Sequence, residues 1–221
     1  ETITGQHFPG MITGKPVGLG GSLGRTEATG FGVVYCLREC LKNMNLPIET
    51  TSASIQGFGN VAEYAARMYT ELGGKLVAVS CWNAADNQAY TFRKAEGCNV
   101  QELVDIKDPF GSIDKEKAIA LGYEVLPGDA WLSQDVDILI PAALENQITP
   151  AVFPQISKQV KVLCEAANGP TTPDCDELIR ESGITLIPDF LCNAGGVTCS
   201  YFEQVQCNMN YFWPKDEVPF L

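Results

Sequence analysis

The feature that most restricts the fold of this chain is a glycine turn between an apolar run and a helical pattern. The segment "SASIQ" leads into Gly57, Gly59 follows two residues later, and Ala62 comes three residues after that. In a dinucleotide-binding turn, the first glycine permits the tight turn, the second lets the backbone approach a pyrophosphate, and the third small residue lets helix and strand pack closely. The pattern therefore predicts a phosphate-binding turn inside a βαβ unit, with a purely structural turn as the alternative.

Short apolar runs alternate with helical patterns along most of the chain. The first helix is predicted from Thr26 to about Met44, because apolar residues recur there three and four apart and Leu46-Pro47 stops the pattern. Six segments are predicted strands: 53–57, 75–80, 123–126, 136–141, 160–165 and 184–188. Buried strands separated by helices need crossover connections, which place helices on both faces of a parallel sheet. We expect an α/β fold with a doubly wound, mostly parallel, six-stranded Rossmann-type sheet in a single domain.

Three segments interrupt or close this alternation. Residues 82–122 form a long insertion between the second and third predicted strands, where we expect a strand hairpin and two short helices. Residues 1–25 are rich in glycine and proline and are expected to form an N-terminal arm, which leaves residues 26–221 for the dinucleotide-binding domain. A closing helix follows "NAGG", and four apolar residues share one of its faces: Val197, Tyr201, Val205 and Met209.

The charge balance narrows the choice of partners. The chain has 221 residues, with 15 Lys and Arg against 27 Asp and Glu, and no basic cluster long enough to follow a phosphate backbone. Nucleic acid and membrane surfaces are therefore not expected as partners. No apolar run approaches the roughly 20 residues that cross a bilayer, and the N-terminus lacks the features of a signal peptide, so we expect a cytoplasmic protein.

Nine cysteines accompany a single histidine, His7. The count is odd, there is no Cys-x-x-Cys pair, and no cysteine pair lies near His7 in the sequence, so no metal site is predicted. Cys36 and Cys40 are one helical turn apart and could share a face. We interpret the cysteines as small buried apolar residues in a reducing compartment.

The residue expected to hold the adenosine ribose is missing from its usual place. In a dinucleotide fold, an acid at the tip of the second strand accepts hydrogen bonds from the ribose hydroxyls, whereas a nearby arginine favours a 2′-phosphate. Here the tip position, 24 residues past Gly57, is Cys81. Asp86 is the nearest acid, and Arg93 and Lys94 are farther along the chain. The choice between NAD and NADP therefore stays open.

Five segments in this order closely resemble the C-terminal, cofactor-binding domain of hexameric glutamate dehydrogenases, in the Glu/Leu/Phe/Val dehydrogenase family. They are "TGKPVGLGGSLGRTEATGFGV" (13–33), "QGFGNVA" (56–62), "VDILIPAALENQIT" (136–149), "CEAANGPTTPDCDE" (164–177) and "IPDFLCNAGGVTCSYFEQVQ" (187–206). The resemblance covers nearly the whole chain. The "SYFE" segment after "NAGGVT" is of the glutamate type, although Gln204 stands where the family usually has Trp.

The resemblance adds Thr29, Asn60, Asn168 and Asn193 as cofactor contacts to the glycine turn and the strand tip, and the full predicted set is Thr29, Gly57, Phe58, Gly59, Asn60, Val61, Cys81, Asn168 and Asn193. Thr29 matches the position at the nicotinamide carboxamide, and a hydroxyl can pair with that uncharged group. Asn168 and Asn193 match residues that line the nicotinamide ribose and the cleft. From the residues alone, Thr29 and Asn60 are equally well explained as helix caps, and the other two asparagines as turn residues.

The resemblance also implies the substrate and the reaction. Ser200 matches the position that binds the side-chain carboxylate of glutamate, although a helical serine is ordinarily exposed or bonded to its own helix. In the complete enzyme, the family's reaction is NAD- or NADP-dependent oxidative deamination of L-glutamate to 2-oxoglutarate and ammonia. The family is hexameric, so a homo-hexamer is the implied assembly of the complete enzyme.

No segment here resembles the substrate domain, which in the family precedes this one and provides the catalytic lysines and aspartate. No catalytic residue is therefore assigned, and we expect a fragment that begins at Glu1 just upstream of the domain junction. Alone, it is expected to bind dinucleotide weakly or moderately and to lack dehydrogenase activity. Two alternatives stay open: a dehydrogenase for an apolar amino acid, and a non-catalytic dinucleotide-sensing module.

Overall fold

A seven-stranded sheet forms the centre of the computed structural model, which describes residues 5–214 and 217. The strand order is β4-β3-β2-β1-β5-β6-β7. The strands are β1 Ser52–Gln56, β2 Lys75–Asn83, β3 Gln88–Arg93, β4 Glu124–Pro127, β5 Ile138–Pro141, β6 Val162–Cys164 and β7 Thr185–Ile187. Only β3 pairs antiparallel with its neighbours, β2 and β4, and the other pairs are parallel. The expected mostly parallel α/β fold is confirmed.

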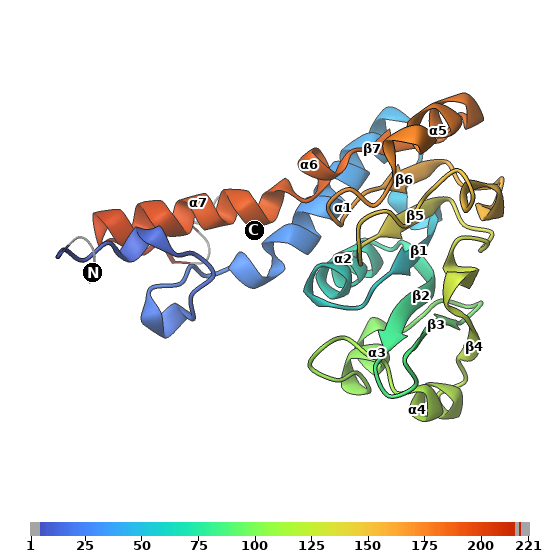
Figure 1. Ribbon diagram of the computed structural model, residues 1–221, viewed down its shortest axis with the longest axis horizontal. Coiled ribbons are helices and arrows are strands. Elements are labelled where there is room, and N and C mark those ends of the chain that lie inside the picture. Colours follow the sequence, from blue (N-terminus) through green and yellow to red (C-terminus); the bar gives the residue numbers. More distant parts are fainter. Residues whose placement is uncertain (1–4, 215–216, 218–221) are drawn as a thin grey trace.

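Helices cover both faces of this sheet (Figure 1). They are α1 Arg25–Asn43, α2 Asn60–Glu71, α3 Val100–Asp105, α4 Lys115–Ala120, α5 Asp176–Ser182, α6 Asp189–Cys192 and α7 Ala194–Met209. Short 3-10 helices lie at Pro9–Met11, Val17–Leu19, Ile48–Thr50, Gly128–Trp131, Phe153–Gln155 and Pro173–Cys175.

Strand β5 shows why the sheet needs an apolar layer on each of its two faces. Its residues alternate between two hydrophobic cores: Ile138 and Ile140 pack into one core with residues of α1 and α2, and Leu139 packs into the other with Trp131 and Ile179. Successive side chains of a strand point to opposite faces, so a strand that is apolar at every position requires an apolar layer on each side. This arrangement confirms the double winding expected from the short apolar runs.

The expected count of six strands was wrong, because the insertion at 82–122 contributes a strand of its own. Strand β3 forms a hairpin with β2 across the turn at 84–87 and becomes part of the main sheet. The two short helices expected in the insertion are α3 and α4. Their N-termini are capped by Asn99, whose Oδ1 accepts from the Gln101 and Glu102 N–H groups, and by Asp114, whose carboxylate accepts from the Lys117 N–H.

Helix α7 leaves the sheet and runs outward, with the N-terminal arm beside it (Figure 1). Glu203 on α7 is fully buried against this arm: its carboxylate accepts from the Gly14 N–H at 2.9 Å and from Lys15 Nζ at 2.7 Å. Gln206 Nε2 donates to Ser22 Oγ at 3.0 Å. The arm and α7 are therefore joined by buried polar contacts. Residues 1–4 of the expected arm, and residues 215–216 and 218–221 of the expected domain, lie outside the described part of the chain.

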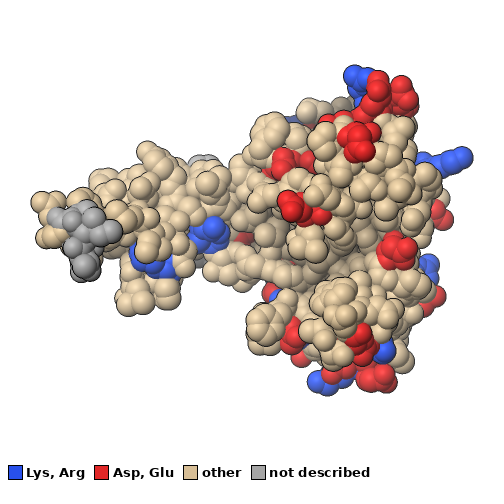
Figure 2. Space-filling view, in the orientation of Figure 1, with Lys and Arg blue, Asp and Glu red and all other residues tan. Residues whose placement is uncertain are grey.

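The apolar face of α7 points away from these contacts. Val197, Tyr201 and Met209 are each more than half exposed, whereas the polar residues Glu203 and Gln206 are buried. Figure 2 shows one face of the molecule, on which most acidic side chains lie over the sheet-bearing part and the projection is largely uncharged. Within the described residues, no helix is both long and apolar enough to cross a membrane.

Candidate functional site

The glycine turn between β1 and α2 lies where the winding of the sheet reverses. Strand β1 has β2 on one side and β5 on the other, and such a switch point is where open α/β sheets bind ligands. Gly57 has a φ of +95°, and a methyl group at this position would lie 2.9 Å from the Ala142 carbonyl oxygen. Gly59 has a φ of −74°, and no heavy atom lies within 4 Å of the place a methyl group would take. The first glycine is thus required by the fold, and the second leaves open space beside the turn.

The start of α2 offers unsatisfied N–H groups at this space. Gly59 is its N-cap, and no side chain caps the helix. The first N–H groups of a helix have no partner within it and face the positive end of the helix dipole, which suits a phosphate. Together with the gap at Gly59, this arrangement fits the pyrophosphate of a dinucleotide.

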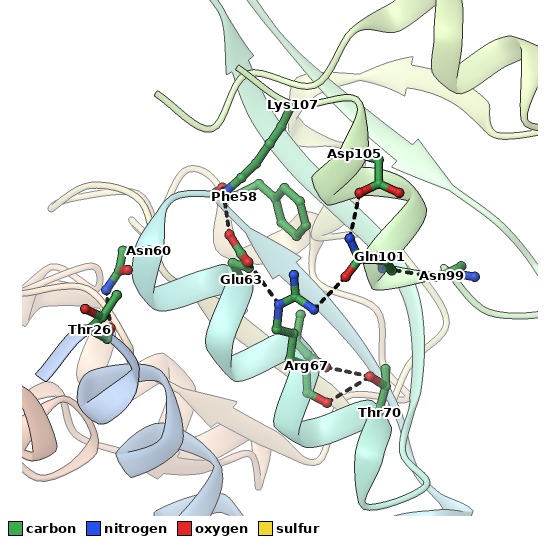
Figure 3. A network of polar contacts seen from close by, with 11 residues as sticks. Thr26, Phe58, Asn60, Glu63, Arg67, Thr70, Asn99, Gln101, Asp105 and Lys107 are labelled. Carbon is green, nitrogen blue, oxygen red and sulfur yellow. Dashed lines mark hydrogen bonds and ion pairs between the residues drawn. The ribbon is translucent and has the colours of Figure 1, made fainter. Parts of the chain in front are cut away.

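Asn60 does not cap α2, which removes that alternative for it. Its Nδ2 donates to the Thr26 carbonyl oxygen at 2.6 Å and ties the start of α2 to the first turn of α1 (Figure 3). One turn later, the Glu63 carboxylate accepts from Arg67 Nε at 2.9 Å and from Lys107 Nζ. Burial alone would raise the pKa of Glu63, but the hydrogen bonds with Lys107 and Arg67 outweigh it and hold the pKa below its usual value. Its charge is therefore balanced within the fold.

A cavity of about 510 Å³ extends from the turn toward α7 and unites residues far apart in the sequence. Five residues predicted for cofactor or substrate line it: Thr29, Val61, Asn168, Asn193 and Ser200. They come from α1, α2, the loop after β6, and the start and body of α7. The remaining predicted positions Gly57, Phe58, Gly59 and Asn60 form the adjacent turn and the start of α2. Cys81, expected at the tip of the second strand, lies two residues before the end of β2, because the hairpin with β3 extends this strand to Asn83.

The two asparagines of this cavity bond to each other. Asn193 Nδ2 donates to Asn168 Oδ1 at 2.7 Å. Asn193 has a φ of −93°, and Asn168 is not among the residues with positive φ. Neither position therefore needs asparagine for a left-handed turn. The pair leaves one further N–H donor on Asn193, both N–H donors of Asn168 and the carbonyl oxygen of Asn193 for a ligand.

Thr29 lies inside α1 rather than at its end, so it is not a helix cap. A methyl group at Gly196 would collide with Thr29 Oγ1, which shows how closely α7 approaches α1 at the "NAGG" segment. The second glycine of that segment therefore allows the α7 backbone to pass directly over the threonine hydroxyl.

Ser200 has a hydrogen-bond partner that was not predicted from the sequence. Arg25 Nε donates to Ser200 Oγ at 2.7 Å, and both residues line the cavity. Arg25 is the first residue of α1, where a positive charge opposes the helix dipole. An arginine at the start of the helical segment "GRTEATG" is therefore the sequence signal that could have indicated a binding role for Arg25.

The side chain of Cys81 is buried in the hydrophobic core. Its side chain is 5% exposed, and its Sγ accepts from the Ile113 N–H at 3.4 Å. Burial raises the pKa of this thiol to about 11. A contact between Cys81 and a cofactor stays a prediction.

The charged groups near this tip form ion pairs. Lys115 Nζ lies 3.1 Å from the Asp86 carboxylate, which also accepts from the Tyr90 hydroxyl at 2.7 Å. The hydrogen bonds from Tyr90 and Lys115 hold the pKa of Asp86 below its usual value. Lys117 is paired with Asp114 in the same way at 3.3 Å.

The cysteines behave as small core residues. All nine are free thiols; seven are buried, and Cys36 and Cys40 are partly exposed. Cys164 and Cys192 approach to 3.1 Å between their sulfur atoms, and their hydrogen bond and burial raise the pKa of Cys164. No group of three or more His, Cys, Asp or Glu side chains in the described ranges 5–214 and 217 could hold a metal ion.

Comparison with solved structures supports this architecture. The chain superimposes on a glutamate dehydrogenase structure with a TM-score of 0.86 at 31% identity, covering 98% of this chain and 48% of that one. The enzyme of Peptoniphilus asaccharolyticus gives a TM-score of 0.75 at 39% identity, over 95% of this chain and 46% of that chain.

Sequence comparison identifies the family. The chain is 45% identical to the NAD-specific glutamate dehydrogenase of Clostridioides difficile over 98% of its length and 50% of the relative's. It is 40% identical to the catabolic NAD-specific glutamate dehydrogenase of Bacillus subtilis over 95% of its length and 46% of that relative's. The chain thus spans about half the length of the curated relatives it matches. Residues 20–219 match the family model described as Glutamate/Leucine/Phenylalanine/Valine dehydrogenase, and the chain belongs to that family.

Proposed function

We propose that this chain is the dinucleotide-binding domain of an NAD-dependent glutamate dehydrogenase. In the complete enzyme, L-glutamate is oxidatively deaminated to 2-oxoglutarate and ammonia. The observation that carries this proposal is the cavity in which Arg25 and Ser200 lie with Thr29, Asn168 and Asn193, next to the glycine turn. The bound dinucleotide supplies the hydride acceptor, and the protein supplies orientation and electrostatics.

Each group in the cavity has a proposed role. The turn from Gly57 to Val61 and the free N–H groups of α2 hold the pyrophosphate. The Asn168–Asn193 pair lies beside the nicotinamide ribose, and the Thr29 hydroxyl bonds the carboxamide. These side chains are uncharged, so they orient the nicotinamide ring without placing a charge on the hydride path.

Arg25 and Ser200 are proposed to hold the distal carboxylate of the substrate. Since Arg25 Nε donates to Ser200 Oγ, the hydroxyl proton of Ser200 is free to donate to a ligand, and the guanidinium has further N–H groups to offer. A cation and a hydroxyl suit a carboxylate and disfavour the aliphatic side chain of an apolar amino acid. This pairing supports glutamate over the apolar-substrate alternative, and a non-catalytic sensor would have no use for it.

NAD is proposed as the preferred cofactor. The relatives from Clostridioides difficile and Bacillus subtilis are named NAD-specific. Near the tip of β2, Lys115 and Lys117 are each engaged by an aspartate, so neither is available to a 2′-phosphate without breaking an ion pair.

The exposed apolar face of α7 is proposed to contact the substrate domain of the complete enzyme. Val197 and Tyr201 on this face lie next to the cavity residues Gly196 and Ser200, so a second domain packed here would close the cavity. A homo-hexamer is the proposed assembly; a structural relative from Thermus thermophilus is described as hetero-hexameric. Nine free thiols support the proposed cytoplasmic location.

Titration of the 221-residue chain with NADH and NADPH, followed by nicotinamide fluorescence, tests the cofactor proposal. We expect saturable binding of NADH, weaker binding of NADPH, and no glutamate-dependent reduction of NAD by this chain alone. Absence of NADH binding would contradict the dinucleotide site, and turnover of glutamate by this chain would contradict its assignment as the cofactor domain only.

A further inference from the structure

Asp189 contacts both of the segments that carry the asparagines of the cavity. It is the first residue of α6, and Asn193 directly follows this helix. Its Oδ2 accepts from the Gly169 N–H at 2.8 Å, and Gly169 comes directly after Asn168 in the loop that follows β6. Its carbonyl oxygen accepts from the Asn193 N–H at 2.9 Å. Asp189 is therefore bonded to the residue beside one asparagine and to the backbone of the other.

The hydrogen bond between the two asparagines closes these contacts into a ring. Asn193 Nδ2 donates to Asn168 Oδ1 at 2.7 Å. The ring thus runs from Asn168 through Gly169 to the Asp189 carboxylate, along the single turn of α6 to Asn193, and back to Asn168. Of these described residues, the two asparagines line the cavity and Asp189 does not.

Glu165 holds the backbone of Asp189 from the side of β6. It directly follows that strand and is 6% exposed, and its Oε2 accepts from the Asp189 N–H at 3.1 Å. The Glu165 N–H donates to the Ile187 carbonyl oxygen at 3.1 Å, which continues the parallel pairing of β6 with β7. The start of α6 is therefore fixed to the strand that leads into the Asn168 loop.

The carboxyl groups of Glu165 and Asp189 come together without a cation. Neither forms an ion pair within the described part of the chain. Burial and the carboxylates of Asp189 and Asp176 raise the pKa of Glu165, and the hydrogen bonds to its carboxyl act in the opposite direction. Two neighbouring acids without a cation cost stability, and exceptions of this kind are expected at functional sites.

We propose that Asp189, supported by Glu165, is a positioning residue that holds Asn168 and Asn193 in the arrangement that binds the nicotinamide ribose of the cofactor. This inference rests on the proposed dinucleotide site. The hydrogen bond between the two amides fixes their distance but not the place of either backbone. The contacts of Asp189 fix both backbones, so the free amide groups meet the ribose hydroxyls together and need no rearrangement. The Asp189 carboxylate itself makes no contact with the cofactor.

Ligand titrations of the 221-residue chain test this role. Asp189→Ala removes the carboxylate, whereas Asp189→Asn keeps one oxygen that can accept from the Gly169 N–H. Asp176→Asn is the matched control, because it removes an exposed carboxylate near Glu165 on another helix, α5. The ligands are NADH, which contains the nicotinamide ribose, and ADP, which ends at the pyrophosphate; calorimetry measures both affinities.

Asp189→Ala should bind NADH about tenfold more weakly, with unchanged affinity for ADP. Asp189→Asn should lose about threefold, and Asp176→Asn should bind both ligands like the unaltered chain. Circular dichroism and urea unfolding show whether each variant is folded. Should Asp189→Ala not fold, Asp189→Ser takes its place, because a serine hydroxyl ends one bond short of the carboxylate oxygen that meets Gly169.

A double-mutant cycle with Asn168→Ala distinguishes positioning from a general effect on the fold. If Asp189 acts through Asn168, the double variant should bind NADH about as weakly as Asn168→Ala alone. Additive losses, or an equal loss of affinity for NADH and ADP in Asp189→Ala, would overturn the positioning role.

Unchanged NADH affinity in the folded Asp189→Ala or Asp189→Ser chain would overturn the role of Asp189 and leave the dinucleotide site intact. Unchanged affinity in Asn168→Ala would contradict the proposed contact of that asparagine, and the positioning role with it. If the unaltered chain binds no NADH, the dinucleotide site itself is wrong.

Discussion

Arg25 Nε and Ser200 Oγ meet at 2.7 Å, although 175 residues separate them along the chain. This contact joins the first turn of α1 to the middle of α7 at the wall of the cavity. It places a permanent positive charge beside a hydroxyl whose own proton is not committed. The pair is therefore suited to bind a carboxylate that enters the cavity.

Replacing Ser200 by Ala in the complete enzyme should lower kcat/KM for glutamate by roughly ten- to a hundredfold, because a charge-assisted hydrogen bond to the substrate is lost. Arg25→Gln should lower it at least as much, and Arg25→Lys should restore part of the loss by keeping the charge. Steady-state kinetics with glutamate measures both effects.

The dissociation constant for NADH is the control for these variants, since neither residue is assigned to the cofactor. If NADH binding falls in parallel with glutamate turnover, the two side chains act on the cofactor or on the fold. Equal loss of activity toward glutamate and norvaline in Ser200→Ala would likewise contradict a role at the distal carboxylate.

Gly57 and Gly59 should respond differently to the same substitution. Gly57→Ala places a methyl group at 2.9 Å from the Ala142 carbonyl oxygen in a backbone with φ of +95°, which should cost roughly 1 to 3 kcal/mol of unfolding free energy. Gly59→Ala meets open space at a negative φ, so stability should be unchanged while the methyl group occupies the approach of the pyrophosphate.

Urea unfolding and NADH titration of the two variants separate the effects. Gly59→Ala is the more informative variant, because its stability should not change, so a loss of NADH binding cannot be attributed to unfolding. Full NADH affinity in Gly59→Ala would contradict the use of this turn for the pyrophosphate.

The sheet was predictable because its strands are buried on both faces and bounded by clear helix signals. The segment 136–141 is predictable from the apolar residues Ile138, Leu139 and Ile140. The structure explains this run, because its side chains pack alternately into the two hydrophobic cores. Strand β3 was expected only as part of a hairpin. Its pairing with β2 makes it part of the main sheet, and its antiparallel pairing with β4, which joins Arg93 to Glu124 across 31 residues, is specified by no local pattern.

The site was predictable where a residue type is tied to backbone geometry, as at Gly57. It was less predictable where two distant side chains meet, as at Arg25 and Ser200. The inward orientation of Cys81 follows from the pleat of the strand, since Val79 two residues earlier faces the same core. The hydrogen bond from the Ile113 N–H that occupies its thiol could not be predicted from the sequence, because Ile113 is 32 residues away. The apolar stripe of α7 was seen correctly as one face, whereas the burial of the opposite, polar face depends on the arm.

Glu203 should make the attachment of the arm to α7 sensitive to acid. Burial alone would raise the pKa of its carboxyl, but hydrogen bonds from Lys15 and Gly14 outweigh burial and lower it below the usual value. A depressed folded pKa means that this stabilisation is fully present above the unfolded pKa, near 4.3 to 4.5, and is lost as the pH falls through the folded value.

Glu203→Gln removes the charge and should lower the unfolding free energy at pH 7 by roughly 1 to 3 kcal/mol. It should also flatten the part of the stability curve below about pH 4.5, as measured by urea unfolding at several pH values. Glu177→Gln is a matched control, because Glu177 is an exposed acid paired with Arg180 on α5. An equally steep acid limb in Glu203→Gln and the unaltered chain would assign the acid sensitivity to other carboxyls.

The ion pair between Asp86 and Lys115 should set part of the discrimination against NADPH. Asp86→Ala leaves Lys115 without its carboxylate partner near the tip of β2, where an adenosine 2′-phosphate is expected. The ratio of NADPH to NADH affinity should then rise roughly three- to fivefold at low ionic strength, since an exposed pair of charges contributes little more than this.

The double variant Asp86→Ala with Lys115→Ala tests whether the released lysine causes the change. If it does, the double variant should return to the original ratio, and the gain in Asp86→Ala should shrink as salt is added, because salt screens exposed charges. Asp114→Asn, which removes the charge beside Lys117 and keeps a capping oxygen for α4, serves as the comparison for general charge effects. An equal rise in the ratio for Asp114→Asn would show that net charge, and not the position of Lys115, governs the preference. A rise that survives in the double variant would exclude Lys115 as the phosphate partner.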